Sequence, residues 1–228
     1  MKRNTVKTIV SFLLVLTFLV SLGTVGAFAK SKTAVGTIPD FVDLSFKAAG
    51  SESSLYRKSH KYCIAVNSKQ NIVIVYGKAK DGSYTKPVKA MVCSCGKIPG
   101  STLAGTWRTY AKYEWRDLVG NTHGQYATRI IGGILFHSVP YYEEDKSTVE
   151  TEEYNKLGTN ASAGCVRLAV KDCKWIYDKC KLGTIVTIYP GTNVKEPLKK
   201  PKAQKIPLTG IKSGWDPTDP DPANPWNK

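Results

Sequence analysis

The sequence has few acidic residues and lacks the spacings that are typical of metal sites. It holds 18 Asp and Glu against 33 Lys and Arg, so its formal net charge is +15. Its six Cys and three His form no C-x-x-C or comparable ligand spacing, and we therefore expect no zinc or other metal site. The lysines are scattered, and no predicted helix carries a basic stripe with interleaved aromatics. This argues against a nucleic-acid partner.

Long apolar runs are also lacking after residue 29. Within residues 1–29, three basic residues precede the apolar stretch from Ile9 to Leu22, and Ala27-Phe28-Ala29 follows it. This order is typical of a secretory signal peptide, so we expect export and cleavage after Ala29. An uncleaved membrane anchor is the alternative, because the stretch approaches the length of a spanning helix. Loss of the three basic residues lowers the charge to +12, which still favours an anionic cell envelope as partner.

One cysteine is surrounded by small residues, in the stretch Asn160-Ala161-Ser162-Ala163-Gly164-Cys165-Val166-Arg167-Leu168. Gly164 permits backbone angles that are closed to other residues, and small side chains let main-chain N–H groups approach a reacting atom. Cys165 is therefore a candidate nucleophile whose oxyanion main-chain donors would stabilise. His137 ends an apolar run that is typical of a buried strand, and it is a candidate base. Taken singly, each residue also fits a structural role, such as a small buried thiol.

The two motifs together point to one family. Ser162-x-Gly164-Cys165-Val166-Arg167, with Phe136-His137-Ser138 upstream, resembles the L,D-transpeptidase (YkuD-type) catalytic domain of bacterial cell walls. The resemblance covers about Tyr62 to Tyr189 and implies a mainly β fold. We expect a β-sandwich or partly closed barrel of mixed strands with one principal helix, and no cofactor.

The resemblance also implies roles for the residues around the thiol. The Ser138 backbone would orient the imidazole of His137, which would form a thiolate–imidazolium pair with Cys165. Many family members have a histidine where this chain has Ala163, so that side chain cannot contribute to the oxyanion site. The main-chain N–H groups of Gly164 and Cys165 would have to stabilise the oxyanion without it. Two further residues, Arg167 and Ser162, would bind substrate or stabilise the turn.

The reaction that the resemblance implies is acyl transfer on peptidoglycan stem peptides. Cys165 would attack the third residue of a stem tetrapeptide, release D-alanine, and pass the acyl group to a second stem as a 3→3 crosslink. Carbapenem-type inhibitors would acylate the same thiol, and the protein is expected to be a monomer. A carboxypeptidase or another cysteine peptidase or amidase is the nearest alternative. A non-catalytic wall-binding module is a more distant one.

The rest of the chain is divided by its composition. Residues 30–61 are expected to be a spacer, residues 62–190 the catalytic domain, and residues 191–228 a Pro-rich tail with a flexible end. The alternative is a tail that docks on the domain or on the wall polymer through Trp215 and Trp226. Within the domain, the pattern predicts strands near 62–66, 72–76, 88–95, 110–115, 126–131, 132–137 and 184–189. The spacing of Cys173, Ile176, Tyr177 and Cys180 predicts a helix that Gly183 caps.

Three smaller features complete the sequence analysis. We expect His123 to lie in a solvated loop, and we expect the acidic segment from Pro140 to Leu157 to cover the substrate and attract its amine. Cys93 and Cys95, two positions apart in a predicted strand, are expected to point to opposite faces and not to bond. Export permits disulfides among the cysteines other than Cys165, but the sequence leaves their connectivity open.

Overall fold

The computed structural model describes residues 58–228. The expected signal peptide and most of the expected spacer therefore lie outside the described residues. Within residues 58–228 no helix is long and apolar enough to cross a membrane.

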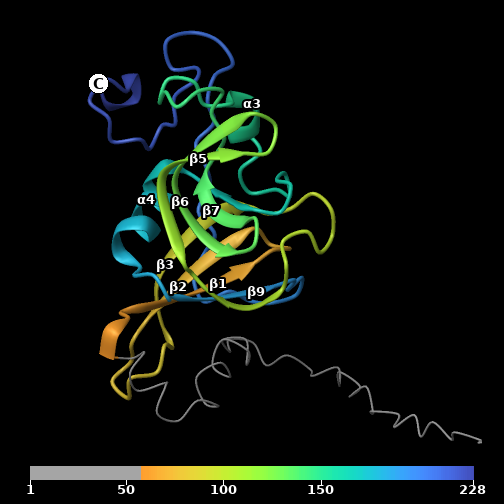
Figure 1. Cartoon of the computed structure of the whole chain (residues 1–228), viewed down its shortest axis with the longest axis vertical. Coiled ribbons are helices and arrows are strands. Elements are labelled where there is room, and N and C mark those ends of the chain that lie inside the picture. Colours follow the sequence, from red (N-terminus) through yellow and green to blue (C-terminus); the bar gives the residue numbers. More distant parts are fainter. Residues whose placement is uncertain (1–57) are drawn as a thin grey trace, which may run out of the picture. The chain divides into compact units, whose positions relative to one another are not determined.

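One mixed sheet of nine strands dominates this part of the chain, in the order β4-β9-β1-β2-β3-β8-β7-β6-β5 (Figure 1). The strands are β1 Tyr62–Asn67, β2 Ile72–Gly77, β3 Lys86–Ser94, β4 Gly105–Arg108, β5 Ala111–Leu118, β6 Thr122–Ile131, β7 Ile134–Ser138, β8 Val166–Leu168 and β9 Ile185–Tyr189. β1 with β9 and β7 with β8 pair in parallel. The edge strand β4 packs against β6 near the other edge, so the sheet curls into a half-barrel. This confirms the predicted mainly β, partly closed fold.

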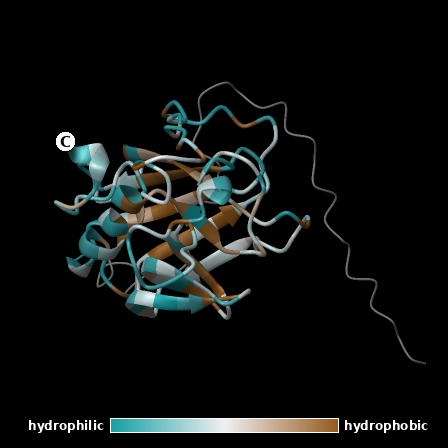
Figure 2. Cartoon of the chain, turned by 90° about the horizontal axis from the view of Figure 1, so that it is seen from above, coloured by the Kyte–Doolittle hydropathy of each residue, from teal (hydrophilic) through white to brown (hydrophobic). Residues whose placement is uncertain are grey.

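Both faces of the central strands are buried, which explains their apolar sequences. In β1, Ile64 and Val66 join one hydrophobic cluster, whereas Cys63 and Ala65 join another on the opposite face. Alternate side chains of a strand point to opposite faces, so each face has its own core. Figure 2 shows these strands as hydrophobic ribbons between more hydrophilic outer segments. The predicted hairpin between β1 and β2 is antiparallel, with Asn67 opposite Ile72.

The principal helix is α4, Val170–Lys179, which packs on β6 and β7. Its buried residues include Cys173 and Ile176, as the helical spacing predicts. Gly183 does not cap it: the helix ends at Lys179, and Gly183 lies in the next turn with a φ of +86°. The short helices are α3, Thr151–Tyr154, and η1, Pro225–Asn227.

Cys93 and Cys95 lie on the same side of the chain, so the prediction of opposite faces is wrong. Their Sγ atoms are 3.9 Å apart and both side chains belong to one buried cluster. Residues two positions apart in a strand return to the same face, which accounts for the error. All six cysteines are free thiols in the structure, Cys173 and Cys180 included.

The Pro-rich tail packs against the catalytic domain instead of ending as a flexible segment. Asp216, Asp219 and Asn224 are fully buried. Asp216 Oδ2 accepts the Val170 N–H at 2.8 Å, at the beginning of α4. The N-cap residue, Ala169, has no side chain that could accept this hydrogen bond. The tail thus supplies the cap that the helix lacks locally.

Further contacts fasten the tail to the segment before the nucleophile. Asn155 exchanges two hydrogen bonds of 2.8 Å with the backbone of Ile206. Gly214 accepts the Val149 N–H at 2.8 Å and donates to Thr151 Oγ1 at 2.9 Å. These partners are distant in sequence, so local composition does not reveal them.

We predict that Asp216→Ala lowers the free energy of unfolding by about 1–3 kcal/mol, because it leaves the Val170 N–H and the Thr218 N–H without their acceptor. Urea denaturation followed by fluorescence measures the change. Asp221→Ala, in the same tail, removes a partly exposed ion pair with Lys146 and an exposed hydrogen bond from the Ala223 N–H, and should cost less than Asp216→Ala because solvent screens these contacts. Equal losses in both variants would contradict the capping role of Asp216.

Candidate active site

Two neighbouring parallel strands bring the candidate base and nucleophile together. β7 pairs with β8 so that His137 lies beside Arg167, and Cys165 immediately precedes β8. Parallel strands need a long crossover connection, which here runs from the end of β7 to the beginning of β8. Residues at the two ends of this connection are therefore distant in sequence but adjacent in the sheet.

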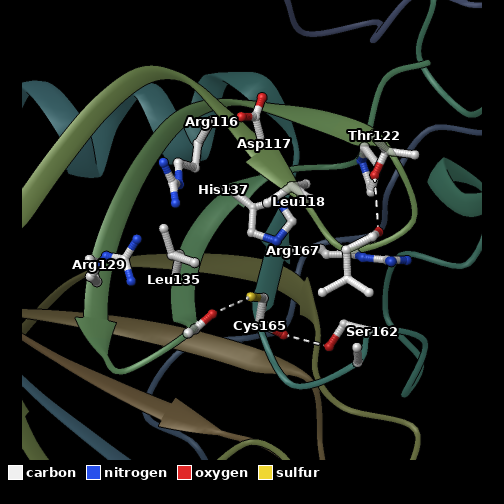
Figure 3. A pocket seen from close by; sticks show the side chains of 14 residues that line it. Arg116, Asp117, Leu118, Thr122, Arg129, Leu135, His137, Ser162, Cys165 and Arg167 are labelled. Carbon is white, nitrogen blue, oxygen red and sulfur yellow. Dashed lines mark hydrogen bonds between the residues drawn. The ribbon is translucent and has the colours of Figure 1, made fainter. Parts of the chain in front are cut away.

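His137 and Cys165 point into one cavity of about 310 Å³ (Figure 3). The other lining residues are Arg116, Asp117, Leu118, Val119, Thr122, Arg129, Gly133, Leu135, Pro140, Ser162, Ala163 and Arg167. Cys165 is partly exposed, whereas the other five cysteines are buried. Within residues 58–228 a molecule in solution therefore has access to one thiol.

The turn before Cys165 is closed by the Ser162 side chain. Ser162 Oγ donates to the Cys165 carbonyl at 2.6 Å and accepts the Gly164 N–H at 3.1 Å. A Cβ at Gly164 would lie 2.7 Å from the Ser101 carbonyl oxygen, so only glycine fits here. Ser162 is buried, and its contacts favour stabilisation of the turn over substrate binding. Of the two donors expected at the oxyanion site, the Gly164 N–H already has an acceptor in this structure.

His137 is oriented by the backbone of the next residue. Its Nδ1 lies 2.6 Å from the Ser138 carbonyl oxygen. Because a carbonyl can only accept, Nδ1 carries the proton and Nε2 is the basic nitrogen. The Ser138 hydroxyl accepts the Gln125 N–H at 2.8 Å and donates to the Val139 carbonyl at 2.9 Å. The end of β7 is therefore tied to β6, which holds the imidazole in place.

The environment shifts the pKa of the thiol and the pKa of the imidazole toward their uncharged forms. Burial raises the pKa of the Cys165 thiol, and burial together with the Arg167 charge lowers the pKa of His137 to about 4. Both shifts oppose the thiolate–imidazolium pair that was expected from the sequence, because low polarity disfavours each charged form. The thiol lies 3.3 Å from the Gly133 carbonyl oxygen, to which it donates.

Arg167 is held by an acidic residue of the crossover connection. Its Nη1 donates to Glu153 Oε2 at 2.5 Å and, at 3.4 Å, to the Ala161 carbonyl. The two charged side chains are 15% and 21% exposed, so they form a partly buried ion pair between β8 and α3. This arrangement favours a structural role for Arg167, although its side chain also lines the cavity.

The acidic segment from Pro140 to Leu157 differs from the expected cover over the substrate. It is a packed layer in which Tyr141, Val149 and Tyr154 are buried in their own hydrophobic cluster. Of this segment, only Pro140 lines the cavity. The carboxylate that does line it is Asp117, on β5.

His123 lies in strand β6 and not in a solvated loop. It pairs with Asp117 across the β5–β6 hairpin and with Tyr141 on the other side. Its Nδ1 lies 3.2 Å from Asp117 Oδ1 and 3.8 Å from Glu144 Oε1. These three side chains form the one group in the described part of the chain whose atoms are close enough to hold a metal ion, within 4.8 Å of one another. Because they come from three segments, no sequence spacing marks them, and both carboxylates are exposed.

Two arginines of the cavity were not recognised in the sequence. Arg116 and Arg129 lie on β5 and β6; Arg129 is within a segment that was predicted only as a strand, and Arg116 is just beyond the end of another. Strand alternation alone does not show which face turns toward the catalytic pair. The strand register would have placed them, since β6 also pairs with the β7 strand that carries His137.

We predict that the rate of Cys165 alkylation by iodoacetamide rises continuously between about pH 6 and pH 9, because the thiolate fraction grows toward a raised pKa. Intact-mass measurement after timed quenching gives the rate, and Cys165→Ala provides the blank. A preformed ion pair would instead give a plateau from about pH 5 upward. Such a plateau would contradict the neutral resting pair.

Known proteins resemble this chain in sequence. The L,D-transpeptidase catalytic domain (YkuD) matches residues 61–188, which is more than half of the chain. YciB of Bacillus subtilis (strain 168), itself a proposed L,D-transpeptidase, is 47% identical over 57 residues. Those residues are 25% of this chain and 28% of YciB, so the alignment spans little more than a quarter of that relative.

Some solved structures resemble this chain at low sequence identity. An L,D-transpeptidase from Mycobacterium smegmatis has a TM-score of 0.46 at 18% identity, covering 57% of this chain and 59% of the other. L,D-transpeptidase LdtMt1 in complex with imipenem has a TM-score of 0.44 at 18% identity, with the same coverage. The assignment rests on the match of residues 61–188: the chain belongs to the L,D-transpeptidase (YkuD) family, a family of cysteine acyltransferases.

Proposed function

We propose that the protein is an exported L,D-transpeptidase that forms 3→3 crosslinks between peptidoglycan stems. The observation that carries this proposal is the convergence of Cys165 and His137 in one cavity, with Nδ1 of His137 fixed on the Ser138 carbonyl. This leaves Nε2 as the base for a thiol that is the accessible one among the described cysteines. A family member with this pair is equipped for acyl transfer through a thioester.

The first half-reaction begins from the neutral pair. As the Cys165 sulfur attacks the carbonyl carbon of the third stem residue, Nε2 of His137 accepts the thiol proton. The carbonyl oxygen becomes an oxyanion, and we assign its stabilisation to the Cys165 N–H, because the Gly164 N–H is bonded to Ser162. Collapse breaks the peptide bond. The imidazolium protonates the departing nitrogen, which releases D-alanine and leaves a thioester.

The second half-reaction reverses these roles. An amine of a second stem enters the cavity, and neutral His137 removes a proton from it as it attacks the thioester carbonyl. The carbon–sulfur bond breaks, Cys165 recovers its proton from the imidazolium, and a new amide joins the two stems. Asp117, which lines the cavity, would attract an acceptor that arrives as an ammonium ion, and this ion loses one proton to solvent before the neutral amine attacks.

The competing activities differ only after the thioester. Water as acceptor would make the protein a carboxypeptidase, and a non-catalytic wall-binding module would not form the thioester at all. The placement of both reactive groups in one cavity favours an enzyme over a binding module. Analysis of the products identifies the acceptor as an amine or as water.

We predict that the purified protein, given a stem tetrapeptide, releases D-alanine and yields a dimer joined through the third residues. Mass spectrometry identifies both products. His137→Ala should abolish both, because one imidazole serves both half-reactions. Release of D-alanine with only tripeptide monomer, at high acceptor concentration, would show that water is the acceptor.

Imipenem provides the matched test of the nucleophile. The wild-type protein should gain the mass of one inhibitor molecule, and Cys165→Ala should gain none. An adduct on Cys165→Ala would remove the assignment of the nucleophile, whatever products the wild-type enzyme makes.

Export is supported by the basic, apolar and small-residue order of residues 1–29. We predict that the secreted protein begins at Lys30, which N-terminal sequencing of material from the culture medium and cell wall checks. Recovery of the intact N-terminus from the membrane fraction would indicate an uncleaved anchor.

A further inference from the structure

Three arginines line the cavity, and they differ in their partners. Arg167 is paired with Glu153. Arg116 and Arg129 form no ion pair with any carboxylate of residues 58–228. Figure 3 shows these two on one side of Cys165 and His137, with Arg167 on the other. The cavity therefore holds two positive charges on one side that no described acidic residue neutralises.

Tyr113 organises these two charges. The guanidinium carbon of Arg116 lies 5.1 Å from the centre of the Tyr113 ring, and that of Arg129 lies 5.6 Å from it. The strand register brings Tyr113 and Arg129 together, since Tyr113 is opposite Ala127 and Arg129 is opposite Ala111. A guanidinium over a ring keeps N–H groups that can bind an anion, although Nη1 of Arg129 is already used by the Gly132 carbonyl.

The turn between β6 and β7 links one of these arginines to the nucleophile. Arg129 Nη1 donates to the Gly132 carbonyl at 2.6 Å. The next carbonyl, that of Gly133, accepts the Cys165 thiol at 3.3 Å. Successive carbonyl groups of a single turn thus contact the guanidinium and the sulfur. An anion bound to Arg129 would therefore lie on the side of the thiol where the Gly132–Gly133 turn runs.

The proposed substrate has an anion at this position. In a stem tetrapeptide the residue that leaves is the C-terminal one, so its free carboxylate is one residue away from the scissile bond. A guanidinium binds a carboxylate through two parallel N–H groups, which fixes orientation as well as charge. Arg129 and Cys165 contact successive carbonyl groups of one turn, and the terminal carboxylate and the scissile carbonyl are likewise successive groups of the substrate.

We propose that Arg129, supported by Arg116, binds the terminal carboxylate of the leaving residue and makes the enzyme specific for acyl donors that end in a free acid. This inference rests on the proposed function. The carboxylate would hold the scissile carbonyl over Cys165, and loss of the carboxylate charge would weaken binding before and during attack.

The test compares a stem tetrapeptide with its C-terminal amide, which has the same shape and no charge. The ratio of kcat/KM for release of D-alanine and of D-alaninamide is measured by mass spectrometry. Wild-type protein should favour the acid by about tenfold or more, as expected for a hydrogen-bonded charged pair. In Arg129→Gln the ratio should fall toward one, and Arg116→Gln should lower it less. Arg129→Lys should keep part of the preference, because it keeps the charge but loses the planar fork.

The matched control is Arg108→Gln, which makes the same chemical change on β4, outside the cavity lining. This variant should keep the wild-type ratio. Because each enzyme is measured with both donors, general damage to the fold or to the Gly132 turn lowers both rates and leaves the ratio unchanged.

Each contrary result has a distinct meaning. Equal use of acid and amide by the wild-type enzyme would overturn the carboxylate site and leave the proposed function intact. An unchanged ratio in Arg129→Gln, with both rates lowered, would assign Arg129 to support of the turn and overturn the proposal. Failure of the wild-type enzyme to release either amine would overturn the proposed function itself.

Discussion

The parallel pairing of β7 with β8 sets the positions of the candidate nucleophile, Cys165, and the candidate base, His137. Two parallel neighbours cannot be joined by a tight turn, so the chain leaves the sheet after Ser138 and returns at Val166. The returning turn places Cys165 next to the strand end that carries His137. The crossover connection between Ser138 and Val166 must pack well enough to keep β8 in register with β7. The buried tyrosines of the crossover and the pair of Arg167 with Glu153 provide that packing.

The same geometry gives the site a low-polarity environment. The strands that present His137 and Cys165 are buried on both faces, and both reactive groups lose solvation with them. In the proposed mechanism the thiol therefore loses its proton during the attack and is not a thiolate beforehand. A neutral thiol among buried neighbours is also less exposed to oxidation than a thiolate would be.

The sequence predicted those features that depend on local patterns. Apolar alternation located most strands, a helical spacing located α4, and two motifs identified the residues that share the cavity. What it missed depends on distant partners. The cap of α4 comes from Asp216 in the tail, and the neighbours of His123 come from another strand and from the crossover. The pKa shifts of the catalytic pair follow from burial, which no motif specifies. The placement of Cys93 and Cys95 was predictable, since strand periodicity alone puts them on one face.

The capping of α4 by the tail also has a consequence for the order of folding. Asp216, which caps the helix, comes after all nine strands in the chain. The Val170 N–H at the beginning of α4 therefore has no acceptor until the tail docks. Because α4 packs on β6 and β7, docking of the tail completes the support of the strand that carries His137.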